Sequence, residues 1–297
     1  MACNIYLRRP RALPLEPRWP RALPLEPAGG NDFPQTPSVG YANLKQNYMT
    51  RIKHYSLAGI FLLLLWQASS RTLGEALLPP PLGVLDFFAR ALVDASFWSH
   101  VWASFLRVSL ALALAWCIAF PLGLLLGYSR KTDRIISPLV FLTYPIPKIV
   151  LLPVFLTVFG LGDAPRIVLV AMTTGYQILV VTRDSALGLD PKYLDSFRSL
   201  GGSQIQMLRH VLVPATLPDA VTALRVASGT AVAVLFMVES FATSSGLGFL
   251  IMDAWGRGDM MEMYAGILAM SIMGVALYEV CNFMEHRLCR WREARRA

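Results

Sequence analysis

Six long apolar segments dominate the sequence and restrict the folds that the chain can adopt. They run over Tyr55–Ser69, His100–Tyr128, Ile135–Phe159, Ile167–Thr182, Val221–Phe241 and Glu262–Phe283. A helix needs about 20 apolar residues to cross a bilayer, and the segments approach that length, although the first and the fourth are short. Charged residues make up only 15% of the chain and hydrophobic residues 55%, whereas about a quarter of the residues of a soluble domain are charged. The sequence therefore predicts an all-α, polytopic membrane protein with six transmembrane helices.

The chain before the first apolar segment has a different composition. It repeats RALPLEP at Arg11–Pro17 and Arg21–Pro27 within a proline-rich run, which can build neither a helix nor a core. We expect a disordered tail over residues 1–48, with translation starting at Met49, whose basic flank leads into Tyr55–Ser69. That first segment has two interpretations, a cleaved signal peptide or a retained helix.

Basic residues are distributed unevenly between the loops. The loops on one side of the six predicted helices hold 15 lysines and arginines, and the loops on the other side hold 4. Because cytoplasmic loops carry the excess of positive charge, this places both termini and the loop Leu189–Pro218 in the cytoplasm. The net charge of +8 has the same origin, so we expect no nucleic-acid partner. We expect lipid contact along the helices.

The loop Leu189–Pro218 is polar but is patterned to fold. Asp190 followed by Pro191 is typical of an N-cap with proline at the first helical position. Gly201 and Gly202 then supply the left-handed stop that favours a helix C-terminus. The pattern predicts a short amphipathic helix.

A second helix is predicted in the same loop. Ser203 and Gln206 have the spacing of a capping box, and Pro214 and Pro218 are expected to close the helix. Apolar faces on two short cytoplasmic helices are costly unless they meet a partner or the ends of the transmembrane helices.

Lys148 and Glu239 are charged residues that fall within the apolar segments. Lys148 follows Pro145 and Pro147, which break the helical ladder, and lipid tolerates such a break only beside other helices or a watery cavity. We therefore place Pro145, Pro147 and Lys148 on a translocation path, where Lys148 would suit an anionic solute. Alternatively, Lys148 extends to the interface or pairs with Glu239. Glu239, the fourth predicted path residue, has gating, helix pairing or direct binding as possible roles.

The loop carries a resemblance to a known family. Asp195-Ser196-Phe197, then Gly201, Pro214 and Leu217-Pro218, resemble the EAA loop of permease subunits of bacterial ABC importers, with Asp-Ser-Phe in place of Glu-Ala-Ala. Further segments resemble the branch that imports nitrate, sulfonates and taurine. They are Ser104-Phe105-Leu106-Arg107-Val108, Pro121-Leu122-Gly123, Pro145-Ile146-Pro147, Phe159-Gly160 and Ser244-Ser245-Gly246-Leu247-Gly248.

The resemblance implies an inner-membrane subunit of the type I importer fold. The core would cover residues 99–286, preceded by a first helix and periplasmic connection over residues 49–98, which favours retention of that helix. A basic cytoplasmic tail would follow over residues 287–297. In the family, this loop docks on a separate cytoplasmic ATPase dimer, which binds the ATP and Mg²⁺, so we expect this chain to bind no cofactor itself. The expected coupling residues are Tyr193, Leu194, Asp195, Phe197, Arg198, Leu200, Gly201 and Ile205.

The resemblance also implies two further partners, a periplasmic substrate-binding protein and a second permease copy. A homodimer agrees with the spacing of Gly123 and Gly127, which resembles a helix-pairing motif. The sequence has no G-x-x-x-x-G-K-[ST] phosphate loop and no hydrolase or metal motif, so we expect no enzymatic activity. The alternative function is an ATP-independent secondary transporter or channel, for which the transmembrane region would show internal repeats.

Overall fold

A computed structural model describes Leu57 and residues 59–293. The helices below all belong to the unit Ala58–Ala297. The predicted tail over residues 1–48 and the predicted start at Met49 lie outside the described residues.

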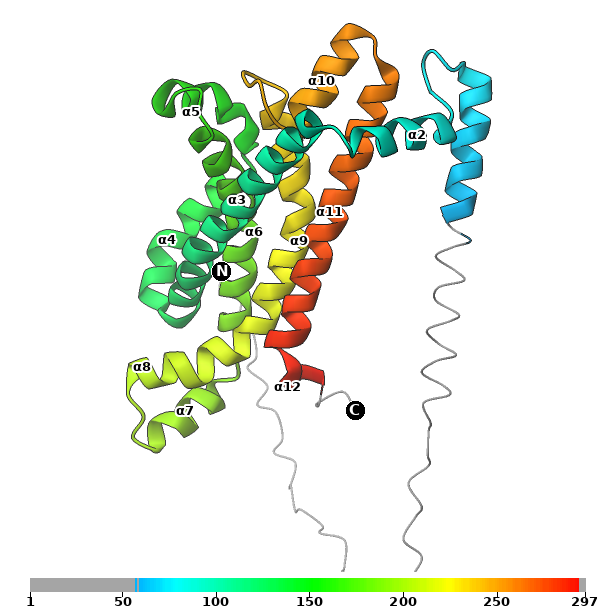
Figure 1. Ribbon diagram of the computed structural model, residues 1–297. Helices are drawn as coiled ribbons and strands as arrows, with labels where there is room; N and C mark the ends of the chain where they lie inside the picture. Colours follow the sequence, from blue (N-terminus) through cyan, green and yellow to red (C-terminus); the bar gives the residue numbers. More distant parts are fainter. Residues whose placement is uncertain (1–56, 58, 294–297) are drawn as a thin grey trace, which may run out of the picture. The chain divides into compact units, whose positions relative to one another are not determined.

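Four long helices form the centre of this unit (Figure 1). They are α3 (Ala95–Tyr128), α6 (Ala164–Leu187), α9 (Val213–Glu239) and α11 (Met260–Leu288). Helix α6 contacts α3 and α9, and α9 also contacts α3 and α11. Small and branched side chains such as Val108, Ala111, Leu169, Ala231 and Leu235 are fully buried between them. Small side chains allow helices in a membrane to pack closely.

Shorter elements join the long helices. They are α2 (Pro81–Ala91), α4 (Arg130–Thr143), the 3₁₀ turn η1 (Lys148–Leu151), α5 (Leu152–Phe159), α7 (Pro191–Ser199), α8 (Gln204–Met207), the π-helical turn η2 (Leu208–Leu212), α10 (Leu247–Arg257) and α12 (Arg290–Glu293). Asp94 caps the start of α3 and Ser129 caps the start of α4, each by accepting a backbone N–H. These caps set where two of the helices begin.

The described residues contain four helices long and apolar enough to cross a membrane, or five if one bent pair counts as a span. Four of the predicted segments are thereby confirmed as such helices. The bent pair lies within the predicted span Ile135–Phe159, where residues 130–143 and 148–159 meet at 84°. Residues 59–73 are also helical, and this described stretch is shorter than the roughly 20 residues that cross a bilayer.

The second helix of the loop does not end where the sequence pattern predicts. Instead of stopping at Pro214 and Pro218, it continues as a span over Gln204–Glu239. Pro214 has no N–H to bond back to the preceding turn, and its ring would crowd the carbonyl four residues earlier. The wider π-helical turn η2 (Leu208–Leu212) lies directly before it and makes room for the ring.

Gly123 and Gly127 pack two helices of the same chain. A Cβ at Gly123 would lie 2.7 Å from Cβ of Thr182, and a Cβ at Gly127 would lie 2.3 Å from Cβ of Ala186. Both glycines of α3 therefore allow α6 to approach closely. Using this spacing as a sign of a homodimer was wrong, because the surface is already occupied within the chain.

Candidate functional site

The loop between α6 and α9 folds as expected at its beginning. Asp190 accepts a hydrogen bond from N–H of Lys192 at 3.0 Å and Pro191 is the first residue of α7. Ser203 and Gln206 form the reciprocal capping box that opens α8. Asp195 and Arg198 form a local ion pair of 3.3 Å on α7. The predicted caps are thus confirmed.

The two glycines between α7 and α8 have different tasks. Gly201 has φ of +77°, and no atom lies within 4 Å of the place that a Cβ would take, so this position needs glycine for its backbone conformation. A Cβ at Gly202 would instead lie 2.0 Å from the ring of Phe197. The aromatic ring that replaces the small residue of the family pattern therefore packs over Gly202 and closes the turn.

The predicted coupling residues separate into two groups. Leu194 packs towards the small cluster of Leu124, Ala186 and Leu212, and Phe197 is half-buried over the turn. Tyr193 is 53% exposed, Leu200 86% and Ile205 79%. The first group fixes α7 to its own bundle, and the second leaves large apolar side chains uncovered.

A second region is the break between α4 and η1, which contains Pro145, Pro147 and Lys148. The Lys148 side chain is buried, and Nζ donates to the carbonyls of Thr143 at 2.7 Å and Tyr144 at 2.6 Å. It also lies 4.2 Å from the ring centroid of Tyr176 on α6. The sequence alternative in which Lys148 pairs with Glu239 was wrong, because the two residues have different partners.

An open groove of about 470 Å³ lies next to this break. Tyr144 lines it together with Gln177 and Val181 of α6 and Asp219 and Thr222 of α9. None of the four predicted path residues is among its lining residues. Tyr144 connects the break with the groove, because it lines the groove and its carbonyl accepts a hydrogen bond from Lys148 Nζ.

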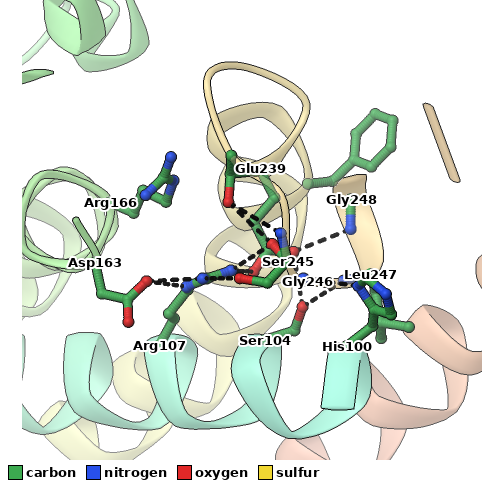
Figure 2. Close-up of polar contacts among 12 residues, drawn as sticks. His100, Ser104, Arg107, Asp163, Arg166, Glu239, Ser245, Gly246, Leu247 and Gly248 are labelled. Carbon is green, nitrogen blue, oxygen red and sulfur yellow. Dashed lines mark hydrogen bonds and ion pairs between the residues drawn. The ribbon is translucent and has the colours of Figure 1, made fainter. Parts of the chain in front are cut away.

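The third region is a buried ion pair between α3 and the end of α9 (Figure 2). Arg107 Nη1 lies 2.7 Å from Glu239 Oε1, and the two side chains are 5% and 0% exposed. A buried charge of either sign is costly unless it is paired and hydrogen-bonded. The pair therefore ties α3 to α9 across 132 positions of sequence.

Glu239 also binds the start of α10. Its Oε2 accepts from N–H of Gly248 at 3.0 Å and from the Ser104 hydroxyl at 2.7 Å, while Ser104 Oγ accepts from N–H of Leu247 at 2.7 Å. These contacts satisfy N–H groups of the first turn and place a negative charge at the positive end of the helix. Gly246 has φ of +110°, and a Cβ there would lie 2.4 Å from the Glu239 carboxyl carbon. The Ser-Gly-Leu-Gly pattern thus lets the backbone reach the carboxylate.

Arg107 makes further contacts on its other edges. Nε donates to Asp163 Oδ1 at 2.7 Å, while Nη1 and Nη2 donate to the Ser245 carbonyl at 2.8 Å and to its hydroxyl at 2.7 Å. All three guanidinium nitrogens therefore have acceptors within the chain. We call Ser104, Arg107, Asp163, Glu239 and Ser245 the Arg107 cluster. The cluster connects helices and loops through hydrogen bonds and ion pairs, and its Glu239 side chain is fully buried.

In the sequence, most of these residues stood out only as parts of segments that resemble the family, and their contacts with one another were not predicted. A signal was available, because Arg107 and Glu239 are opposite charges within two apolar segments. Charges at membrane depth usually pair with one another. The outcome agrees with helix pairing as the role of Glu239, one of the three roles left open by the sequence.

The chain is similar to known transport permeases over most of their length. The chain is 26% identical over 217 residues to the putative aliphatic sulfonates transport permease SsuC of Bacillus subtilis, covering 73% of this chain and 79% of that protein. It is 28% identical to the taurine transport system permease TauC of Escherichia coli, covering 75% and 83%. It is 27% identical to the formylaminopyrimidine transport permease ThiX of Halalkalibacterium halodurans, covering 79% and 94%.

Solved structures share the fold. An inward-facing structure of the MetNI methionine ABC transporter matches with a TM-score of 0.57 at 21% identity, covering 64% of this chain and 94% of that one. A bacterial alginate ABC transporter matches with a TM-score of 0.56 at 14% identity, covering 84% and 98%. A family model described as the inner membrane component of binding-protein-dependent transport systems matches residues 119–292. The chain belongs to this family, the permease components of ABC transporters, and is itself a transport subunit without catalytic function.

Proposed function

We propose that the chain forms the solute path of an ATP-driven importer and couples it to a separate ATPase through residues 189–218. The observation that carries this proposal is the apolar group Tyr193, Leu200 and Ile205, which is exposed on a loop whose helices are otherwise firmly capped. Exposed apolar surface of this kind favours a protein partner. Family membership supports an ATPase as that partner and removes the support for an ATP-independent carrier.

The division of labour within the loop supports mechanical coupling. Leu194 and Phe197 hold α7 against the bundle and the turn, while α8 continues through η2 into α9. A force applied at Ile205 is therefore passed to α9 without a flexible connection. In this proposal, ATP and Mg²⁺ are bound by the ATPase dimer, and its closure pulls the loops of two permease copies together.

The solute path runs along the groove beside the break at Pro145 and Pro147, between two copies of the chain. Gln177, Asp219 and Thr222 support this placement, because they are polar residues from α6 and α9 that line the groove. The Arg107 cluster, including Glu239, holds the helices together at the other end of α9. Both termini lie in the cytoplasm, and a periplasmic binding protein delivers the solute.

The solute is a small anion or zwitterion such as a sulfonate, taurine or nitrate. The support comes from relatives named for aliphatic sulfonates and taurine. Another relative is named for formylaminopyrimidine transport. Uptake of a heterocyclic solute in place of an anion would therefore overturn this part of the proposal. Uptake of radiolabelled taurine by the reconstituted complex, measured against an alkanesulfonate and an aminopyrimidine, separates these classes.

The coupling surface is tested by adding one carboxylate at either of two neighbouring positions. We expect Ile205→Glu to reduce the co-expressed ATPase retained by the purified permease by at least about tenfold, since a truncated or charged contact at the centre of an interface costs about 2 kcal/mol or more. Gln204→Glu, the matched control, places the same group on an exposed polar position at the start of α8 and is expected to retain the ATPase. Equal retention by both variants would show that this surface does not bind the ATPase.

A further inference from the structure

The bend within the predicted span Ile135–Phe159 leaves backbone carbonyls without their usual partners. In an α-helix, the carbonyl of residue i accepts from the N–H of residue i+4. For Thr143 that residue is Pro147, which has no N–H. For Tyr144 it is Lys148, which already belongs to η1 beyond the 84° bend. The Thr143 carbonyl accepts instead from N–H of Ile146 at 3.2 Å, whereas no backbone N–H among the described residues donates to the Tyr144 carbonyl. An unsatisfied carbonyl is expensive in a membrane protein.

The Lys148 ammonium donates to both of these carbonyls. Nζ is 2.7 Å from the Thr143 carbonyl and 2.6 Å from the Tyr144 carbonyl, and the residue is 8% exposed. An ammonium has three donors. Two are used by these carbonyls, and the Tyr176 ring lies 4.2 Å away, within the range of a cation–π contact. A positive charge also suits the C-terminal end of a helix such as α4.

Tyr176 fixes the same corner to α6. Its hydroxyl lies 2.8 Å from Thr143 Oγ1, so the residue contacts the last turn of α4 directly and the Lys148 ammonium through its ring. The end of α4, the start of η1 and the middle of α6 therefore meet at one buried cation.

We propose that Lys148 is a positioning residue that fixes the bend by donating to the Tyr144 carbonyl, which the bend leaves without a backbone partner, and by adding a second donor to the Thr143 carbonyl. A solute anion at this ammonium would have to displace two backbone hydrogen bonds and the contact with Tyr176, so the side chain acts on the path through the backbone. Tyr144 links Lys148 to the path, because its carbonyl accepts a hydrogen bond from Lys148 and the residue lines the groove. An effect of Lys148 on transport rests on the proposed solute path, whereas the role of Lys148 in fixing the bend does not.

A double-mutant cycle tests the role in the bend. Lys148→Met removes the donors at nearly constant length, and Pro147→Ala restores a backbone N–H for Thr143. In the otherwise unchanged permease purified with its ATPase, we expect Lys148→Met to lower the apparent Tm by at least about 4 °C. In the Pro147→Ala background we expect less than half of that loss, because interacting positions are not additive.

Two further variants complete the test. Lys148→Arg is expected to retain most of the Tm, since the guanidinium also donates to several acceptors, and Lys131→Met, which removes an exposed lysine of α4, is expected to leave Tm unchanged. An equal loss from Lys148→Met in both backgrounds would overturn the proposal. So would a Lys148→Met variant of unchanged Tm that loses only uptake of an anion such as taurine, which is the behaviour of a solute ligand. Neither result depends on the docking of Ile205, so failure here is distinguishable from failure of the coupling proposal.

Discussion

Glu239→Gln is expected to destabilise the permease by about 3 kcal/mol, the lower end of the range for a buried ion pair that loses one partner. The variant keeps the shape of the side chain but leaves Arg107 with only the partly exposed Asp163 as a negative neighbour. It also weakens the acceptor for N–H of Gly248 at the start of α10. The loss is measured as a decrease in the apparent Tm and in the amount of folded protein recovered from membranes.

The control for Glu239→Gln is an ion pair at the surface. Arg90 and Asp86 pair on α2 with side chains 78% and 63% exposed, and exposed pairs contribute only about 0–1 kcal/mol. We therefore expect Arg90→Met to leave the apparent Tm nearly unchanged. If Glu239→Gln behaves in the same way as Arg90→Met, the Arg107 cluster does not hold α3, α9 and α10 together.

Gly127→Ala is the second substitution for which we expect a large effect, even though it adds one methyl group. The new Cβ would lie 2.3 Å from Cβ of Ala186 and 2.8 Å from the carbonyl of Arg183, so α3 and α6 would have to separate. Overpacking of this kind typically costs about 1–3 kcal/mol. The measurement is the apparent Tm of the purified permease.

Gly229→Ala provides the matched control on another long helix. Nothing lies within 4 Å of a Cβ at Gly229 in α9, and alanine favours a helix over glycine by up to about 1 kcal/mol. We expect this variant to be as stable as the natural sequence or slightly more stable. If Gly127→Ala were as stable as Gly229→Ala, the close packing of α3 on α6 would be incorrect.

Much of the local structure could be predicted because its causes are local. The helix start at Asp190 and the capping box of Ser203 and Gln206 depend on residues two to three positions apart, and both were confirmed. The apolar segments likewise predicted the long helices, because lipid requires continuous apolar helices. The prediction of an all-α membrane permease followed from the helix caps, the apolar segments and the resemblance to the permease subunits of ABC importers.

The errors concern interactions between distant or competing features. Pro214 is a correct signal for a helix stop, but the π-helical turn before it removes the clash, and such a turn has no clear sequence signal. The spacing of Gly123 and Gly127 indicates a close helix contact without naming the partner helix. The role of Lys148 on a solute path stays a prediction, whereas its contacts depend on the geometry of the bend at Pro147 and have no sequence signal.

Site-specific photo-crosslinking tests whether the exposed apolar group Tyr193, Leu200 and Ile205 binds an ATPase. A benzoylphenylalanine at position 200, where Leu200 is 86% exposed, is introduced into the intact complex in membranes, with position 150, where Val150 is 68% exposed, as the control. We expect position 200 to cross-link to a subunit that carries a nucleotide-binding phosphate loop and position 150 not to do so. Recovery of the intact complex without any cross-link from position 200 to that subunit would show that this apolar group does not bind the ATPase.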